Sequence, residues 1–206
     1  MAERPQLYLV TPPAFEPAPF AGLLARTLDA APVACVRLAL AAASEDTLVR
    51  AADALRPVCH DRDVPLVIAD HFRLAARLGL DGVHLTDGAR QVRAARSALG
   101  ADAIVGAFAR ASRHDGMTAA EIGADYVAFG PVTASALGDG RAAPRDLFAW
   151  WSELIETPVV AEGGVTAAAA ADLADLVDFL ALGEELWAHP AGPTQALADF
   201  LQAAGG

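Results

Sequence analysis

The segment Thr157–Thr166, with the sequence TPVVAEGGVT, joins a short apolar run to a glycine pair. Gly163 and Gly164 separate this run from an alanine-rich stretch that Thr166 is suited to cap as a helix. Glycines at a strand-to-helix turn let the backbone approach a ligand and direct N–H groups at an anion. A turn that needs glycine only for its backbone conformation is the competing interpretation.

Charged side chains stand in or after three other apolar runs. Arg37 lies within the run Val33–Ala39, where a buried guanidinium needs a carboxylate or a ligand anion. Its partner is therefore either the structural carboxylate of Asp70 or a bound anion. Asp70 ends another run and is a candidate Mg²⁺ ligand or a helix cap. His84 follows Asp81-Gly-Val and is either an acid–base group or a structural histidine.

Strand-like runs alternate with helical patterns along the whole chain. Strands are expected at Gln6–Thr11, Val33–Ala39, Pro65–Ala69, Gly82–Leu85, Ala103–Ala107, Tyr126–Phe129, Pro158–Ala161 and Asp178–Leu182. Helices are expected at Phe20–Ala30, Glu45–Arg62, Phe72–Leu78, Ala89–Leu99, Gly116–Ile122, Asp146–Glu156, Ala167–Leu176 and Thr194–Ala203. Ser44 and Thr166 are expected N-caps, and Gly79, Gly100 and Gly123 are expected C-caps.

This alternation predicts a (β/α)₈ TIM barrel that forms a single domain over residues 1–206. A doubly wound open sheet is the alternative, but the turn after the first strand reads Thr11-Pro-Pro where such folds carry a glycine fingerprint. In a barrel the functional residues lie at the carboxyl ends of the strands. The glycine turns after the seventh and eighth strands are expected to bind a phosphate, and the loop Val132–Pro144 is long enough to close over a ligand.

Composition restricts the partners. The chain has 206 residues, 54% of them hydrophobic, and a formal net charge of −11, which disfavours nucleic acid and anionic membranes. No signal-like start or long apolar span is apparent, so a cytoplasmic protein is expected. Cys35 and Cys59 are expected to be reduced, buried thiols. Trp150-Trp151 marks either core packing or a contact surface of a homo-oligomer.

Four segments carry a resemblance to a known family. They are Leu7-Tyr-Leu-Val-Thr11, Asp81-Gly-Val-His-Leu85, Gly123–Pro131 with the sequence GADYVAFGP, and Pro158–Val165 with the sequence PVVAEGGV. In this order and spacing the chain resembles thiamine phosphate synthases and the related thiazole tautomerases. The resemblance implies a magnesium-dependent enzyme that joins a pyrimidine methyl diphosphate to a thiazole phosphate. The reaction in that family is dissociative, so the site must stabilise a departing pyrophosphate.

The same resemblance assigns roles to individual positions. Arg37, Asp70 and His84 become candidate catalytic residues, and Asp70 and Asp87 become candidate ligands of Mg²⁺. The candidate substrate- and phosphate-binding residues are Gly130, Ser135, Gly163, Gly164, Gly183 and Arg110. Several family positions differ here: Cys35 and Ala39 flank Arg37, Phe108 replaces a small hydroxyl residue, and only Arg141 could replace a loop lysine.

Glu162 precedes the glycine pair where the family has an apolar residue, and it is expected either to repel a ligand phosphate or to pair with Arg37 or Arg110. Three functions therefore stay open. The first is a thiamine phosphate synthase with weakened or altered activity. The second is a non-catalytic barrel that binds a small phosphorylated ligand or acts as a regulator. The third is a metal-independent thiazole tautomerase-like isomerase that uses His84 as its acid–base group.

Overall fold

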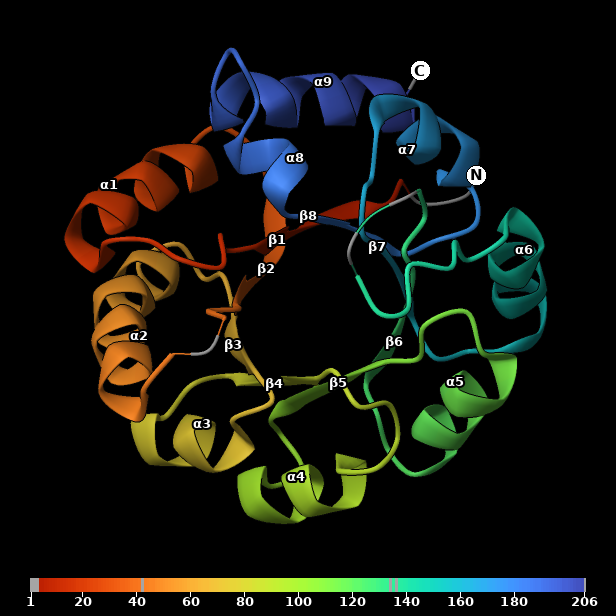
Figure 1. The fold of residues 1–206 in the computed structure, drawn as a ribbon, viewed down its shortest axis with the longest axis horizontal. Coiled ribbons are helices and arrows are strands. Elements are labelled where there is room, and N and C mark those ends of the chain that lie inside the picture. The colour runs from red at the N-terminus through yellow and green to blue at the C-terminus, as the bar shows by residue number, and fades with distance from the viewer. Residues whose placement is uncertain (1–3, 42, 134, 136, 206) are drawn as a thin grey trace.

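Eight parallel strands close into a barrel surrounded by helices (Figure 1). The computed structural model describes residues 4–41, 43–133, 135 and 137–205. The strands pair in the order β1 to β8, and β1 closes the ring against β8. The predicted (β/α)₈ barrel is confirmed, and the open doubly wound alternative is wrong because it would leave two edge strands unpaired.

The elements of the described residues follow the expected alternation. The strands are β1 (Gln6–Val10), β2 (Val33–Leu38), β3 (Leu66–Ala69), β4 (Gly82–Leu85), β5 (Ile104–Phe108), β6 (Tyr126–Phe129), β7 (Val159–Glu162) and β8 (Phe179–Leu182). The helices are α1 (Pro17–Leu28), α2 (Glu45–His60), α3 (Phe72–Leu78), α4 (Val92–Leu99), α5 (Arg113–Glu121), α6 (Arg145–Leu154), α7 (Ala167–Leu173), α8 (Glu184–Trp187) and α9 (Pro193–Gly205).

Local signals set most of the helix ends. The Ser44 and Thr166 side chains accept hydrogen bonds from the N–H groups three residues on, as expected of N-caps. Gly79 ends α3 with a left-handed φ of 63°. The sequence predicted that α4 begins at Ala89, but it begins at Val92. The single-turn helix α8 was not predicted.

The barrel interior holds its own small core, separate from the larger one between strands and helices. Tyr8, Tyr126 and Phe108 are its large members. Gly106 makes room for this filling, because a Cβ atom at this position would lie 2.0 Å from the Tyr126 ring. The aromatic side chains thus close the middle of the barrel and leave its carboxyl end open to a ligand.

In the outer core, Trp151 is fully buried and its indole N–H donates to the Thr157 carbonyl, so at least this tryptophan serves core packing. Cys35 and Cys59 are buried free thiols, as predicted. Within the described part of the chain, no helix is both long and apolar enough to cross a membrane.

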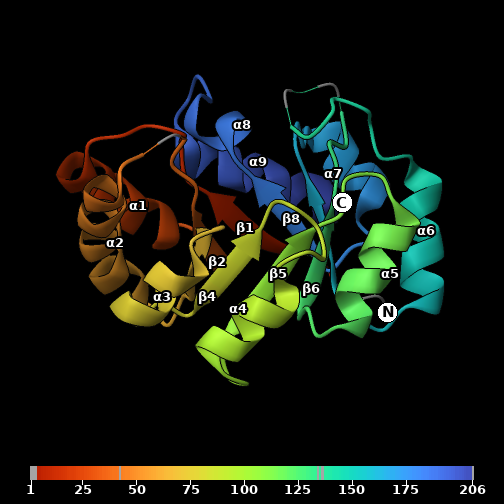
Figure 2. The same ribbon diagram turned by 60° about the horizontal axis from the view of Figure 1, so that its bottom comes forward.

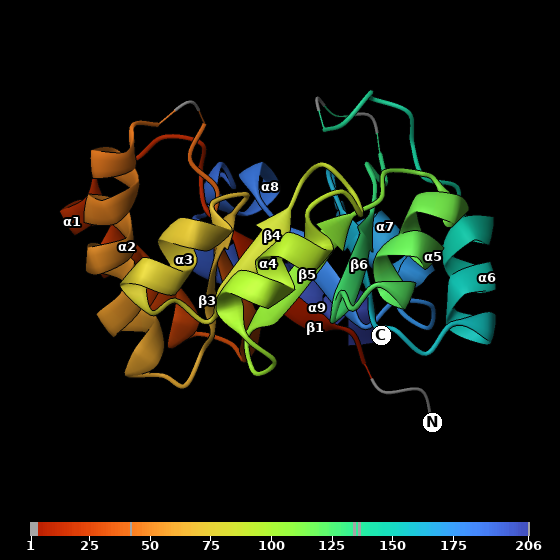
Figure 3. The same ribbon diagram turned by 90° about the horizontal axis from the view of Figure 1, so that it is seen from below.

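The loops after the strands gather at one end of the molecule. Figures 2 and 3 show α8 and the long loop between β6 and α6 above the strands. Residues at the carboxyl ends of distant strands therefore face a common space.

Candidate active site

A cavity of about 610 Å³ opens at the carboxyl end of the barrel. It combines side chains from β2, β7 and β8 with the glycine turns that follow β7 and β8 and with the β6–α6 loop. Its lining includes Val10, Pro13, Arg37, Ala41, Ser135, Leu137, Glu162, Gly163, Gly164, Ala181, Gly183, Glu184 and Glu185. Five predicted site residues therefore share one cavity: Arg37, Ser135, Gly163, Gly164 and Gly183.

A buried ion pair lies at the base of this cavity. The Arg37 guanidinium binds the Glu162 carboxylate through both Nη atoms, with an Nη1–Oε2 distance of 3.1 Å. Both residues are nearly inaccessible, at 4% and 6% exposure. Burial has the largest single effect and would lower the pKa of Arg37, but the Glu162 carboxylate, together with Tyr8 and Tyr126, outweighs it and raises that pKa. The guanidinium charge is thus neutralised by the protein itself.

This pair decides between the partners considered for Arg37. The carboxylate beside Arg37 is that of Glu162, so the alternative in which Asp70 pairs with Arg37 is wrong. The prediction that Glu162 pairs with Arg37 is confirmed. Glu162 reaches Arg37 because it is the last residue of β7, one position beyond the expected end of that strand. Its register partner on β8 is Ala181, whose small side chain leaves the cavity open.

His84 joins the ion pair to the aromatic core. Its Nδ1 atom lies 2.9 Å from the Tyr126 hydroxyl, which in turn lies 2.8 Å from the Tyr8 hydroxyl. Its Nε2 atom lies 3.8 Å from a Glu162 carboxylate oxygen, too far for a hydrogen bond. Burial lowers the pKa of His84 well below its ordinary value, and Arg37 lowers it further. His84 is therefore neutral at neutral pH, with its ring held by Tyr126.

The glycine turn after β7 is shaped by the β6–α6 loop. Gly163 and Gly164 have φ angles of 84° and 67°, the left-handed region that favours glycine. A Cβ atom on Gly164 would lie 2.3 Å from the Thr133 hydroxyl oxygen. That hydroxyl donates to the Gly164 carbonyl, and the Val132 N–H donates to the Gly163 carbonyl at 2.9 Å. The turn and the loop are thus fixed to one another.

A second carboxylate, that of Glu185, faces backbone N–H groups at the β8 turn. One of its oxygens accepts from the Val165 N–H at 3.3 Å. Burial raises the pKa of Glu185, the N–H groups of Gly183, Val165 and Glu185 itself oppose the rise, and Glu162 adds to it. These N–H groups lie where the sequence predicted phosphate binding. An acidic side chain of the protein currently satisfies them.

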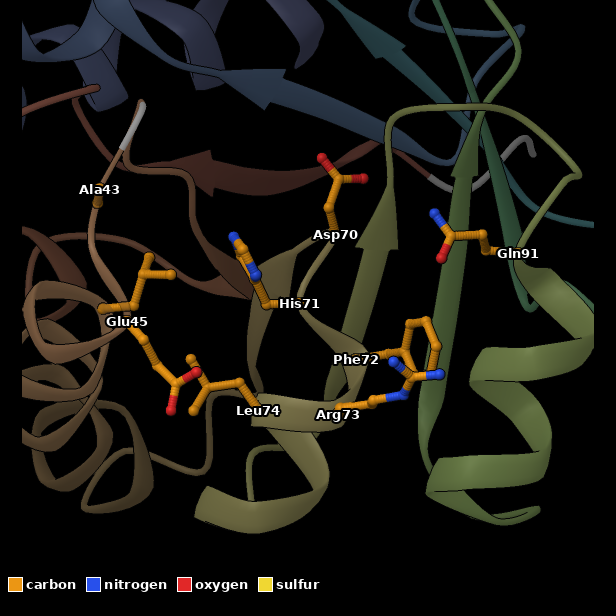
Figure 4. A pocket seen from close by; sticks show the side chains of 9 residues that line it. Ala43, Glu45, Asp70, His71, Phe72, Arg73, Leu74 and Gln91 are labelled. Carbon is orange, nitrogen blue, oxygen red and sulfur yellow. The ribbon is translucent and has the colours of Figure 1, made fainter.

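Asp70 lines a different cavity, of about 280 Å³, between α2, α3 and the start of α4. Figure 4 shows its side chain between His71 and Gln91. One Asp70 oxygen accepts from the Thr86 N–H and the other from the Thr86 hydroxyl, each at 2.7 Å. The carboxylate holds the end of β3 to the loop after β4. Arg37 does not line this cavity, and His84 is buried and lines neither of the two, so the structure does not gather the three predicted catalytic residues in one space.

The second predicted magnesium ligand, Asp87, accepts a hydrogen bond from the Gln91 amide through one oxygen at 3.0 Å. Its other oxygen is buried without a partner among the described residues. Mg²⁺ needs oxygens arranged nearly octahedrally, supplied by carboxylates together with water or substrate phosphate. Both Asp70 oxygens are bonded to Thr86, one Asp87 oxygen has no partner, and no group of three or more His, Cys, Asp or Glu side chains is gathered in the described part of the chain, so these two carboxylates would hold Mg²⁺ only together with water or substrate phosphate.

Gly130, Ser135 and Arg110 follow the carboxyl ends of β6 and β5. Gly130 is buried, and a Cβ atom there would meet the Glu162 carbonyl oxygen at 2.0 Å, so its glycine allows β6 and β7 to approach. The Ser135 hydroxyl accepts from the Leu137 N–H at 3.2 Å. Arg110 is exposed and has a left-handed φ of 55°.

The sequence did not identify Tyr8 and Tyr126 as members of the site. Tyr8 and Tyr126 lie in two of the segments that carry the family resemblance, which is the one signal that pointed to them.

The fold and the site together define a (β/α)₈ barrel with a polar cavity at the carboxyl end of its strands, the end at which such barrels bind their ligands. The family model described as thiamine monophosphate synthase matches residues 7–185. The chain belongs to this family.

Individual relatives agree with the family assignment. A thiamine-phosphate synthase of Rhodospirillum centenum is 47% identical over 197 residues, which cover 95% of each chain. One of Hyphomonas neptunium is 37% identical and covers 96% of this chain and 92% of its own. A solved thiamine phosphate pyrophosphorylase from Pyrococcus furiosus superposes with a TM-score of 0.83 at 22% identity, covering 98% of this chain and 97% of its own, which supports the fold.

Proposed function

We propose that this protein is a thiamine phosphate synthase that joins a pyrimidine methyl diphosphate to a thiazole phosphate in the cavity above Arg37. The match of residues 7–185 to the family carries this proposal, together with relatives of that name up to 47% identical over nearly the whole chain. The cavity of about 610 Å³ is of the size that small-molecule sites take.

In this reaction the bond between the pyrimidine methylene carbon and the diphosphate oxygen breaks, and pyrophosphate leaves with the electron pair. The thiazole nitrogen then donates its lone pair to the methylene cation, forming the new carbon–nitrogen bond. In the proposed reaction, backbone N–H groups of the Gly163–Gly164 and Gly183 turns, whose glycines line this cavity, bind the thiazole phosphate. Glu162 lies at the base of the same cavity, but its carboxylate is paired with Arg37, so it offers the cation little net charge.

The departing pyrophosphate needs positive charge. Arg37 is paired with Glu162, so Arg110 and Arg141, which are exposed on the loops after β5 and β6, are the arginines named from the sequence that are left to supply it. Magnesium dependence, implied by the family, stays a prediction. Cytoplasmic location and self-association likewise stay predictions.

The direct test is an assay with both substrates in the presence and absence of Mg²⁺, following thiamine phosphate and pyrophosphate. Ala181→Leu fills the cavity from β8 and should lower the rate at least about tenfold. Ala34→Leu, the same substitution at a cavity of about 210 Å³ at the amino ends of β1 and β2, is the matched control and should leave it unchanged. Equal formation of both products by the wild type supports the proposal. No product from folded protein refutes it.

One observation favours a second candidate, the metal-independent isomerase with His84 as its acid–base group: the His84 Nε2 atom is buried without a hydrogen-bond partner among the described residues. That function requires isomerisation of a carboxythiazole phosphate without metal and its loss in His84→Ala. Ligand binding without either reaction would instead indicate the non-catalytic barrel.

A further inference from the structure

Arg37 is the only cation among the described residues that line the cavity, and the same lining carries three carboxylates, those of Glu162, Glu184 and Glu185. The side chains of this lining have a net negative charge, which opposes the phosphate groups that backbone N–H groups of the two glycine turns would bind. How strongly it does so depends on which of these charges is free to act on a ligand.

Glu162 occupies the two Nη atoms that Arg37 would otherwise present to an anion. A carboxylate bound to both ends of a guanidinium fork has the same geometry as a bound carboxylate or phosphate ligand. The Nε atom of Arg37 is buried and has no partner among the described residues. The Arg37 guanidinium is more than nine-tenths buried, and one of its N–H donors beside the cavity thus has no hydrogen-bond partner among the described residues.

We propose that Glu162 is an internal competitor for anions, which sets the charge preference of the cavity by holding Arg37 away from phosphate-bearing ligands. An anionic ligand reaches Arg37 only if it displaces Glu162. The cavity therefore discriminates against highly charged anions at its base and admits neutral or cationic ring systems there. This inference concerns binding alone and holds whether or not the protein turns over the proposed substrates.

Titration calorimetry with inorganic pyrophosphate, in metal-free chloride buffer, tests this inference. Glu162→Gln keeps an acceptor beside Arg37 but removes the charge, so pyrophosphate affinity should rise at least about tenfold. For a removed charge about 5 Å from the ligand at an effective dielectric near 20, the rise is on the order of a hundredfold.

Two control variants separate competition at Arg37 from a change in net charge. Glu184→Gln removes the same charge from an exposed position of the same cavity, and the affinity should change by less than about threefold because solvent screens it. Arg37→Leu combined with Glu162→Leu removes the competing carboxylate and the guanidinium together, so its affinity for pyrophosphate should not exceed that of the wild type.

An unchanged affinity in folded Glu162→Gln overturns the inference, as does a gain of equal size in Glu184→Gln or in the double variant. Glu162→Leu provides a second measurement, because it leaves the guanidinium unpaired. If that variant is unfolded in chloride buffer, recovery of its far-UV circular dichroism with pyrophosphate at constant ionic strength supports the inference. Failure to recover overturns it.

Discussion

Replacement of Arg37 by leucine should destabilise the fold by about 3 to 5 kcal/mol, because it leaves the Glu162 carboxylate buried without its guanidinium. The two side chains are hydrogen-bonded to each other at two points, and both are nearly excluded from water. At about 4 Å and an effective dielectric near 20, the attraction alone is worth about 4 kcal/mol. Most of the measured loss would be the cost of an uncompensated buried charge rather than the net value of the pair.

Glu162→Leu should cost a similar amount, whereas the double variant with leucine at both positions should lie within about 1 to 2 kcal/mol of the wild type. Leucine fills part of each volume, and neither charge is then left unpaired. The free energies of unfolding are measured by urea titration of all four proteins at about pH 8. That pH lies above the ordinary pKa of histidine, so that a proton on His84 does not offset the unpaired carboxylate in Arg37→Leu.

The refuting result is additivity. If the loss in the double variant equals the sum of the two single losses, the two side chains act independently and Glu162 does not neutralise Arg37. Single variants as stable as the wild type would equally refute a buried ion pair, because exposed pairs contribute at most about 1 kcal/mol.

Other features of the structure give further testable outcomes. His84 has a lowered pKa in the folded state, so below about pH 6.5 the unfolded chain binds more protons than the folded protein. The free energy of unfolding, measured by urea titration, should therefore fall by about 1.4 kcal/mol for each pH unit below that value. In His84→Gln this contribution to the pH dependence should be absent. Asp70→Ala removes both hydrogen bonds from Thr86 and should lower the free energy of unfolding by about 1 to 3 kcal/mol even without metal. An unchanged free energy of unfolding would show that these hydrogen bonds do not stabilise the fold. Gly164→Ala places a Cβ atom 2.3 Å from a side-chain oxygen of the β6–α6 loop and should reduce binding of a thiazole phosphate in calorimetry, whereas Gly79→Ala, with a similar φ and open space around it, should lose only stability.

Local signals made most of the fold predictable. Apolar runs of strand length, hydroxyl N-caps and glycines after helices act within a few residues, so they are visible in the sequence. The single-turn helix α8 was missed because Glu184–Trp187 is too short for a helical period to show. Strand ends were misjudged at Phe108 and Glu162, because pairing with Ala128 and Ala181 on neighbouring strands, rather than local composition, extends those strands.

The residues of the site were easier to predict from the sequence than the contacts between them. Arg37, Glu162 and Asp70 could each be recognised as charges that need partners, but Arg37 and Glu162 are 125 positions apart. Which carboxylate reaches the guanidinium depends on the barrel's curvature and on where each strand ends. The Tyr8–Tyr126–His84 contacts are likewise set across the barrel interior, where Gly106 makes the room.

A crystal structure of the protein with a thiazole phosphate bound would test the central claim most directly, namely that the turns after β7 and β8 hold the phosphate of the ligand. We expect phosphate oxygens within hydrogen-bond distance of the backbone N–H groups of the Gly163–Gly164 and Gly183 turns, with Glu185 displaced from the Val165 N–H. A phosphate bound instead in the cavity beside Asp70 would contradict the account.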